Sequence, residues 1–279
     1  MQIKDALKSA AAKLSGSDTA YLDARILLMY ILNISFEQLL IRYNEELSPK
    51  KTSEYFKLVD RRMSLEPIAY IIGRQEFYGM DFAVDKNILI PRPETELIID
   101  SVLENRASYP NQDFRILDLG TGSGNIAISL AKEIEEVKIT AVDISSKALK
   151  IARKNALTHN ALNQITFLKS DWYKNIRDCK FDFIVSNPPY ISRADKHLVA
   201  KQTALFEPKL ALYAEDDGLA AYREIISGAS KFLKNDGKII LEIGFNQYGQ
   251  IAYLLKKSGF NKFLLKRDLS EQPRVVVVN

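Results

Sequence analysis

The sequence predicts an α/β protein, with a mainly parallel β-sheet covered by helices on both faces and a small helical bundle before it. Three observations support this fold class. From about residue 114, short apolar segments alternate with amphipathic helical segments, which is typical of parallel sheets. Residues 1–66 instead carry apolar residues at helical spacing. The 279 residues are 47% hydrophobic and 27% charged, as in ordinary globular chains rather than disordered ones.

Two apolar stripes predict the first helices. They consist of Ile3, Leu7, Ala10 and Leu14, and of Ala24, Leu27, Leu28, Ile31 and Leu32. Apolar residues at this spacing share one helical face and predict a core on that side. Ser17 and Asp18 are predicted to cap the second helix. Ser48 is predicted to cap a later one, because a proline follows it at the first helical position.

The pattern changes around Gly79, where apolar and polar residues begin to alternate between Phe77 and Val84. Alternation about a turn residue predicts a β-hairpin. The expected domains are a helical, partner-binding domain over residues 1–74, a linking hairpin over residues 75–90 and an α/β domain over residues 91–279.

Short apolar runs predict the strands of the sheet. They cover residues 116–119, 139–142, 165–168, 183–185 and 239–243. The valine-rich tail, residues 274–278, predicts a further buried strand. We expect this strand to close the sheet and to run antiparallel to its neighbours.

A glycine-rich turn follows the first of these strands and leads into a helix predicted to start near Asn125. It contains Gly120, Thr121, Gly122, Ser123 and Gly124. Glycines let the backbone approach a ligand closely, and the helix N-terminus offers free N–H groups. Asp143 ends the next strand, about twenty residues on, where a carboxylate can accept hydrogen bonds from ribose hydroxyls. These features predict a site for a nucleotide-like cofactor, with a plain structural turn as the alternative.

Asn125 stands where a nicotinamide-binding turn has its third glycine, which disfavours that cofactor. An acid, Asp118, followed by the glycine turn instead resembles the first motif of class I methyltransferases, which use S-adenosylmethionine. In that fold the third strand leads to the adenine, and here it leads to Asp171 and Trp172. Asp171 can bond to the exocyclic amine while Trp172 flanks the ring. A tryptophan at the rim of the core is an equally good interpretation.

The fourth strand leads into Asn187, Pro188, Pro189 and Tyr190. Two prolines after a strand hold the backbone rigidly and remove two N–H donors, which leaves carbonyl groups as acceptors. The side-chain carbonyl of Asn187 and the carbonyl of Pro188 can accept both N–H bonds of a planar NH2 group. Tyr190 can pack on the flat target. This pattern predicts methylation of an amide or aromatic amine nitrogen without a general base.

Four segments together resemble the PrmC/HemK family, the release factor glutamine methyltransferases. They are residues 91–96, 118–124, 187–190 and 206–208, the last followed by Ala211 and Leu212. The resemblance implies a Rossmann-like, seven-stranded sheet, S-adenosylmethionine as cofactor and class 1 peptide-chain release factors as partners. The implied reaction methylates the N5 side-chain amide of the glutamine in their Gly-Gly-Gln motif.

The resemblance also assigns roles to residues. It implies that residues 120–124, Asp143, Trp172 and Asn187 contact the cofactor, and that residues 187–190 contact the glutamine. It suggests that residues 91–96 lie near the cofactor, so Arg92 and Thr95 are secondary candidates. Glu242, a carboxylate within an apolar strand, is predicted either to have a buried partner or to face the surface. Residues 191–205 form a polar connection long enough to act as a lid or as a loop that contacts a partner.

Composition restricts the remaining functions. Cys179 is the only cysteine, so neither an intrachain disulfide nor a cysteine-based metal cluster can form, and we expect no metal site. The chain lacks an apolar run of about 20 residues and a signal peptide. We therefore expect a cytoplasmic protein without membrane contact.

Two alternatives to the glutamine substrate stay open. An adenine N6 amino-methyltransferase of nucleic acid resembles the 187–190 motif as well. Residues 1–75, however, contain 11 Lys and Arg against 9 Asp and Glu, which does not favour a stable nucleic-acid partner. The other alternative is a cofactor-binding scaffold without turnover.

Overall fold

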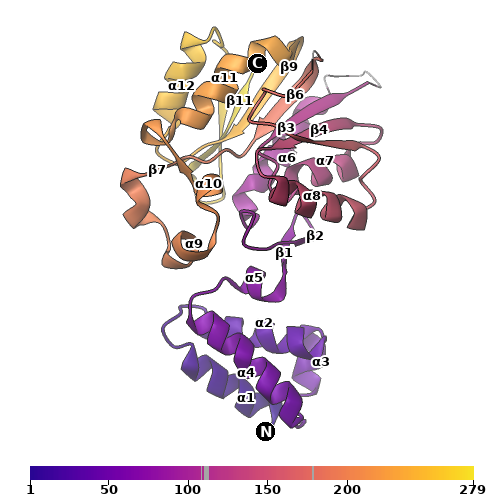
Figure 1. The fold of residues 1–279 in the computed structure, drawn as a ribbon, viewed down its shortest axis with the longest axis vertical. Helices are drawn as coiled ribbons and strands as arrows, with labels where there is room; N and C mark the ends of the chain where they lie inside the picture. Colours follow the sequence, from indigo (N-terminus) through magenta and orange to yellow (C-terminus); the bar gives the residue numbers. More distant parts are fainter. Residues whose placement is uncertain (108, 110–112, 178) are drawn as a thin grey trace. The chain divides into compact units, whose positions relative to one another are not determined.

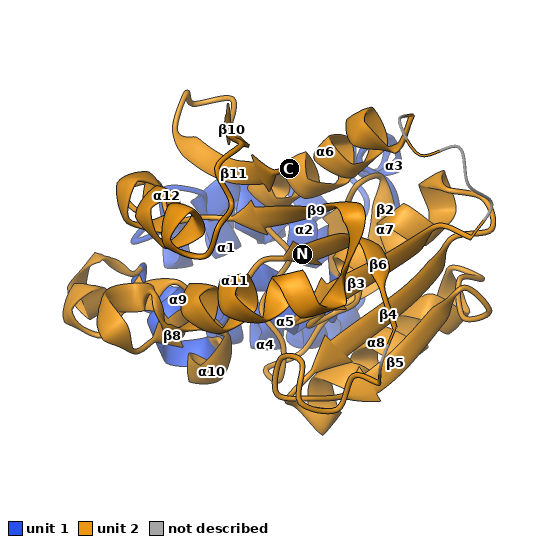
Figure 2. Ribbon diagram, turned by 90° about the horizontal axis from the view of Figure 1, so that it is seen from above, with its two compact units in different colours: residues 1–74, 200–206 blue, residues 75–199, 207–279 orange. Residues whose placement is uncertain are grey.

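The computed structural model describes residues 1–107, 109, 113–177 and 179–279. The chain divides into two compact units, residues 1–74 with 200–206 and residues 75–199 with 207–279, which are coloured separately in Figure 2. The first is helical and the second is α/β (Figure 1). None of the helices in the described part of the chain is long and apolar enough to cross a membrane.

The first unit is built from short helices around its own core. These helices are α1 Ile3–Lys13, α2 Ala20–Leu32, α3 Phe36–Ile41, α4 Pro49–Met63, α5 Ile68–Ile72 and α9 Lys201–Phe206. Both predicted stripes contribute to this core, for example through Leu7 and Leu28, which are fully buried. The helical character predicted from the apolar spacing is therefore confirmed.

One predicted helix cap is wrong and another is confirmed. The N-cap of α2 is Thr19, which makes no side-chain capping bond. The hydroxyls of Ser17 and Thr19 instead donate to the carboxylate of Asp23, at 3.3 and 3.0 Å. The hydroxyl of Ser17 is thus bonded to Asp23, and neither Ser17 nor Asp18 caps the helix. Ser48 does cap α4, where its side chain accepts a backbone N–H bond.

The second unit contains a seven-stranded sheet in the order β10-β11-β9-β6-β3-β4-β5. The strands are β3 Arg115–Leu119, β4 Lys138–Asp143, β5 Ile165–Lys169, β6 Phe181–Ser186, β9 Leu233–Glu242, β10 Phe263–Arg267 and β11 Pro273–Val278. Five adjacent strands, β5, β4, β3, β6 and β9, are parallel to one another. The tail strand β11 runs antiparallel to β9, as predicted. The prediction that it closes the sheet is wrong, because β10 pairs antiparallel with its other side and forms the edge.

Helices cover both faces of the sheet. They are α6 Glu96–Arg106, α7 Asn125–Glu133, α8 Ser146–Thr158, α11 Ala220–Phe232 and α12 Tyr248–Lys257. The short α10 Lys209–Leu212 instead directly precedes β8. Successive strand residues enter different cores: Ile116 belongs to one apolar cluster and Leu117 to the other. Burial on both faces explains the near-continuous apolar strands. The predicted α/β class is confirmed.

Two segments of the chain differ from the expectation. The hairpin is shorter than residues 75–90, with strands β1 Arg74–Phe77 and β2 Met80–Ala83 around Tyr78 and Gly79, whose φ values of 51° and 72° suit a tight turn. The polar connection over residues 191–205 has structure of its own. It contains β7 Ile191–Ser192, which pairs with β8 Tyr213–Ala214, the 3-10 helix η2 Ala194–Leu198, and most of α9.

Candidate cofactor and acceptor site

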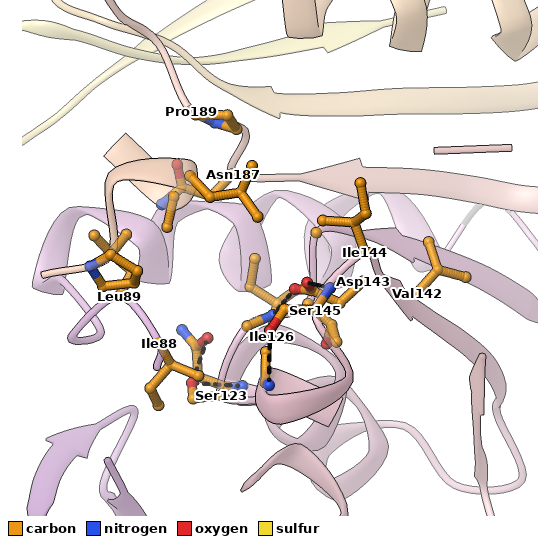
Figure 3. Close-up of a pocket in the computed structure, with 18 of the residues that line it drawn as sticks. Ile88, Leu89, Ser123, Ile126, Val142, Asp143, Ile144, Ser145, Asn187 and Pro189 are labelled. Atoms are coloured by element: carbon orange, nitrogen blue, oxygen red, sulfur yellow. Dashed lines mark hydrogen bonds between the residues drawn. The ribbon is translucent and has the colours of Figure 1, made fainter. Parts of the chain in front are cut away.

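A cavity lies at the carboxyl ends of β3, β4 and β6, where parallel sheets commonly bind ligands (Figure 3). It is lined by the glycine turn, the loops after β4, β5 and β6, and two further segments between residues 87–95 and 208–211. Of the predicted site residues, those on its wall are Gly120, Thr121, Gly122, Ser123, Asp143, Asp171, Trp172, Asn187 and Pro189. Gly124, Pro188 and Tyr190 are not among the residues that line it.

The glycine turn has the backbone that its sequence predicts. Gly120 and Gly122 have φ values of 76° and 56°, in the left-handed region that favours glycine. The amides of Gly120 and Thr121 both donate to the carbonyl of Val142 at 2.9 Å, so the turn is held against the end of β4. The helix α7 follows from Asn125, and its first amides point towards the same end of the sheet.

Asp143 is held at the cavity wall by two backbone amides. One carboxylate oxygen accepts from the N–H of Gly122 at 2.9 Å and the other from the N–H of Ser145 at 2.8 Å (Figure 3). Burial raises the pKa of Asp143. Each carboxylate oxygen has a second lone pair, so both can still accept a hydrogen bond from a ligand hydroxyl. The carboxylate therefore fits the ribose of a nucleoside cofactor.

The loop after β5 brings Asp171 and Trp172 to the cavity. Trp172 has a φ of 47°, and its carbonyl accepts from the hydroxyl of Ser170 at 2.7 Å. Asp171 pairs with Lys174 at 2.5 Å. The structure thus places both residues where the sequence puts an adenine, and their contacts with that ring stay a prediction.

Asn187 follows β6 and is anchored by a hydrogen-bonded side chain. Its side-chain nitrogen donates to the hydroxyl of Thr95 at 3.0 Å, and that hydroxyl donates to the carboxylate of Glu242 at 2.6 Å. Glu242 is therefore a buried hydrogen-bond partner, which resolves the two interpretations left open by the sequence. The secondary candidate Thr95 lies on the cavity wall together with Arg92.

Tyr190 lies in a different environment from the one expected of a substrate contact. It packs beside the apolar cluster of the α11 face, where burial raises its pKa. Its carbonyl accepts from the side chain of Gln247 at 3.0 Å. A Cβ on Gly218 would lie 2.3 Å from that carbonyl oxygen, so only glycine fits there. These contacts fix the chain just after the predicted acceptor.

Residues 87–89 and 208–211 contribute a further wall of the cavity, which the sequence did not predict. A buried carboxylate joins these two segments. Glu207 accepts from the side chain of Arg92 at 2.5 Å and from the backbone N–H of Ile90 at 3.1 Å. These contacts bring Pro208 and Leu210 to the cavity beside Arg92. The sequence signal for this wall was the segment over residues 206–208, which resembles the PrmC/HemK family.

Comparisons with known proteins agree with this geometry. A family model described as Methyltransferase small domain matches residues 94–214, and one described as PrmC N-terminal domain matches residues 5–73. Among solved structures, the hMettl16 catalytic domain in complex with an RNA hairpin superposes with a TM-score of 0.58 at 16% identity, over 83% of this chain and 82% of that one. The fold is that of a class I methyltransferase.

The curated relatives define the family more closely. The Release factor glutamine methyltransferase of Burkholderia pseudomallei is 41% identical over 95% of this chain and 94% of its own length. That of Streptococcus pneumoniae is 41% identical over 88% and 87%. The chain belongs to the release factor glutamine methyltransferase family. It also matches the Bifunctional methyltransferase of Rickettsia prowazekii at 43% identity over 99% of the chain, but spans just over half, 57%, of that relative.

Proposed function

We propose that this protein transfers a methyl group from S-adenosylmethionine to the N5 side-chain amide of the glutamine in the Gly-Gly-Gln motif of class 1 peptide-chain release factors. The observation that carries the proposal is Asn187, an anchored amide on the wall of the same cavity as the glycine turn. The names of relatives at 41% identity over most of the chain support this substrate. Such a substrate implies a cytoplasmic site of action.

S-adenosylmethionine fits the wall between the glycine turn and the loop after β5. Asp143 would hold the ribose, Asp171 and Trp172 the adenine, and the turn over residues 120–123 would lie against the amino acid part. The bound cofactor supplies a methyl group on a positively charged sulfur. Residues of this chain would bind the cofactor and position the acceptor nitrogen.

The chain's main contribution is to position the acceptor. An amide nitrogen is a weak nucleophile because its lone pair is delocalised, so it must be held in line with the methyl group. The side-chain oxygen of Asn187 and the carbonyl of Pro188 would accept the two N–H bonds and stabilise the positive charge that develops. As the methyl group leaves the sulfur, which becomes a neutral thioether, the new N–C bond would make the nitrogen acidic. One of its protons would then pass to water without a general base.

Mass spectrometry of the Gly-Gly-Gln peptide tests this function, after incubation of the protein with S-adenosylmethionine and a bacterial release factor. We expect one added methyl on the glutamine. Replacement of Asn187 with alanine should lower turnover by about 100-fold or more, with cofactor affinity within about threefold of the unaltered protein. The control Asn261→Ala removes an exposed amide whose contact is local and should behave as the unaltered protein does.

Adenine-containing DNA serves as the parallel acceptor in the same experiment. Label in the DNA and none on the glutamine would replace the proposed substrate with an adenine amino group. Transfer to glutamine at full rate by Asn187→Ala would contradict the acceptor role of this residue.

A further inference from the structure

A chain of hydrogen bonds runs from the cavity wall into the core of the α/β unit. It starts at the side-chain nitrogen of Asn187, passes through the hydroxyl of Thr95 and ends on the carboxylate of Glu242, with donor–acceptor distances of 3.0 and 2.6 Å. Thr95 and Glu242 are each 2% exposed. Thr95 precedes α6 and Glu242 ends β9, so two elements far apart in the sequence hold the amide of Asn187.

The available protons determine which group donates and which accepts in each of these hydrogen bonds. An ionised carboxylate can only accept hydrogen bonds, and a threonine hydroxyl has a single proton to donate. That proton goes to Glu242. Towards Asn187 the hydroxyl of Thr95 can then only accept, so the asparagine must present its NH2 group to it. The side-chain oxygen of Asn187 is consequently left as the acceptor for a ligand.

This direction matters because the two ends of an amide have nearly the same shape. Without a polar constraint, Asn187 could face a substrate with either its oxygen or its NH2 group. The glutamine side chain has the same ambiguity. An oxygen on Asn187 selects the NH2 end of the glutamine, whereas an NH2 group would select its carbonyl oxygen and turn the reacting nitrogen away.

We propose that Thr95 and Glu242 are positioning residues that fix the orientation of the Asn187 amide and thereby determine which end of the substrate amide is bound for methylation. The inference rests on the proposed function, in which the Asn187 oxygen receives an N–H bond from glutamine. Neither residue touches the reacting atoms in this scheme; both act through Asn187.

The cost of burying Glu242 supports a role for its charge. A carboxylate removed from water without a salt bridge is expensive, and none of the described salt bridges includes Glu242. A glutamine would fill the same space at a lower cost, but it has a donor as well as an acceptor and would not fix the direction of the Thr95 hydroxyl. Burial raises the pKa of Glu242 to about 7, so assays at about pH 8 test the ionised form.

Thr95→Val removes the hydroxyl and keeps the shape of the side chain. At saturating substrates we expect kcat to fall about 10- to 100-fold, with the Kd for S-adenosylmethionine within about twofold of the unaltered protein. Thr95→Ser restores the hydroxyl and should recover most of the rate. The control Ser101→Ala removes a buried hydroxyl within α6, which among the described residues donates to the carbonyl of Leu97 in the same helix, and should leave kcat unchanged.

Peptide binding separates orientation from general loosening of the site. The unaltered protein should prefer a Gly-Gly-Gln peptide over a Gly-Gly-Glu peptide, whose carboxylate is only an acceptor. In Thr95→Val and Glu242→Gln we expect this preference to shrink about tenfold, because the Asn187 NH2 group can turn to the cavity. A loosened site would weaken both peptides equally, and that result, or an unchanged kcat in Thr95→Val, would overturn the proposal.

A third measurement does not depend on the substrate. In protein labelled with ¹⁵N-asparagine, the NH2 protons of Asn187 should exchange slowly with water, and they should exchange faster in Thr95→Val. If the unaltered protein methylates no glutamine but this difference is found, the positioning stands and the proposed substrate fails. If the exchange rate is the same in both proteins, the positioning fails whatever the substrate.

Discussion

Three glycines in the turn before α7 have a positive φ, and one of them is also needed for close packing. Side chains at Gly120 or Gly122 would meet nothing closer than 4.0 Å, so their need for glycine lies in the positive φ. At Gly124 a Cβ would lie 3.0 Å from the Ile128 side chain and 3.2 Å from that of Ala152. Gly124 therefore lets α7 and α8 pack closely, and its predicted cofactor contact stays a prediction.

Asp118 shows how a single buried acid links stability to pH. Its side chain is fully buried, one oxygen accepts from the hydroxyl of Thr121 at 2.6 Å, and the other has no partner among the described residues. Burial raises its pKa from 3.8 to about 7. Between about pH 4 and pH 7 the folded protein keeps a proton on Asp118 that the unfolded chain has already released. The contribution of this group to the free energy of unfolding is therefore complete below about pH 4 and is lost as the pH rises to about 7.

We predict that Asp118→Asn flattens this pH dependence. In the unaltered protein, ionisation of Asp118 lowers the free energy of unfolding by at most about 4 kcal/mol as the pH rises. The variant has no carboxyl group at this position, so this decrease is absent. Part of the slope should persist, because burial also raises the pKa of Glu242 to about 7. Urea unfolding at several values between about pH 5 and pH 8 measures the difference. Parallel stability curves for the two proteins would contradict the assignment.

At the scale of elements, one asparagine joins three pieces of the α/β unit. Asn155 of α8 is 1% exposed. Its side chain accepts from the N–H of Ala83 in β2 at 2.8 Å and donates to the carbonyl of Ala83 at 3.1 Å and that of Ser123 at 2.9 Å. The hairpin, α8 and the glycine turn are thus bonded through a single side chain.

We predict that Asn155→Ala lowers the free energy of unfolding by about 3 kcal/mol, because it leaves buried backbone groups of Ala83 without partners. Denaturant unfolding of the full chain measures this change. Asn105→Ala is the matched control, since that amide donates to one carbonyl within its own helix, and it should cost less than about 1 kcal/mol. Equal losses in the two variants would show that the three-way contact adds nothing.

At the scale of the whole molecule, the two units have separate apolar cores. The helical unit has one cluster of its own, and the α/β unit has one on each face of its sheet. The proposed cofactor site lies entirely within residues of the α/β unit. Its integrity should therefore not depend on the core of the first unit. Segment 200–206 belongs to the helical unit although it lies far from the rest of that unit in the sequence. Within the helical unit, the side chain of Gln202 accepts a hydrogen bond from Arg62 at 2.9 Å.

We predict that deletion of residues 1–66 spares cofactor binding and weakens binding of the release factor. The cofactor Kd should stay within about threefold, while the Kd for the release factor should rise tenfold or more. Isothermal titration with each ligand measures both, on a truncated protein shown by its thermal transition to be folded. Unaltered release-factor affinity in that protein would remove the helical unit from the partner-binding surface.

The sequence by itself determined the features that local patterns encode. Apolar spacing predicted the helices of the first unit and the strands of the sheet, and the valines of the tail predicted its buried strand. The turn after β3 and the acceptor segment after β6 were recognised because glycine and proline restrict the backbone wherever they occur. The edge strand β10 was missed, since its residues are only partly buried and show no clear alternation.

Only the tertiary structure decided which distant residues meet. Thr95 bonds to Glu242 across 147 positions in the sequence, and Arg92 to Glu207 across 115. No local pattern predicts these contacts, because they exist only after the sheet has brought the ends of β6 and β9 beside the start of α6. The same packing sets the direction of the Asn187 amide. The physical reason is that a side chain's residue type defines what it can donate or accept, whereas its partner depends on the packing of the whole unit.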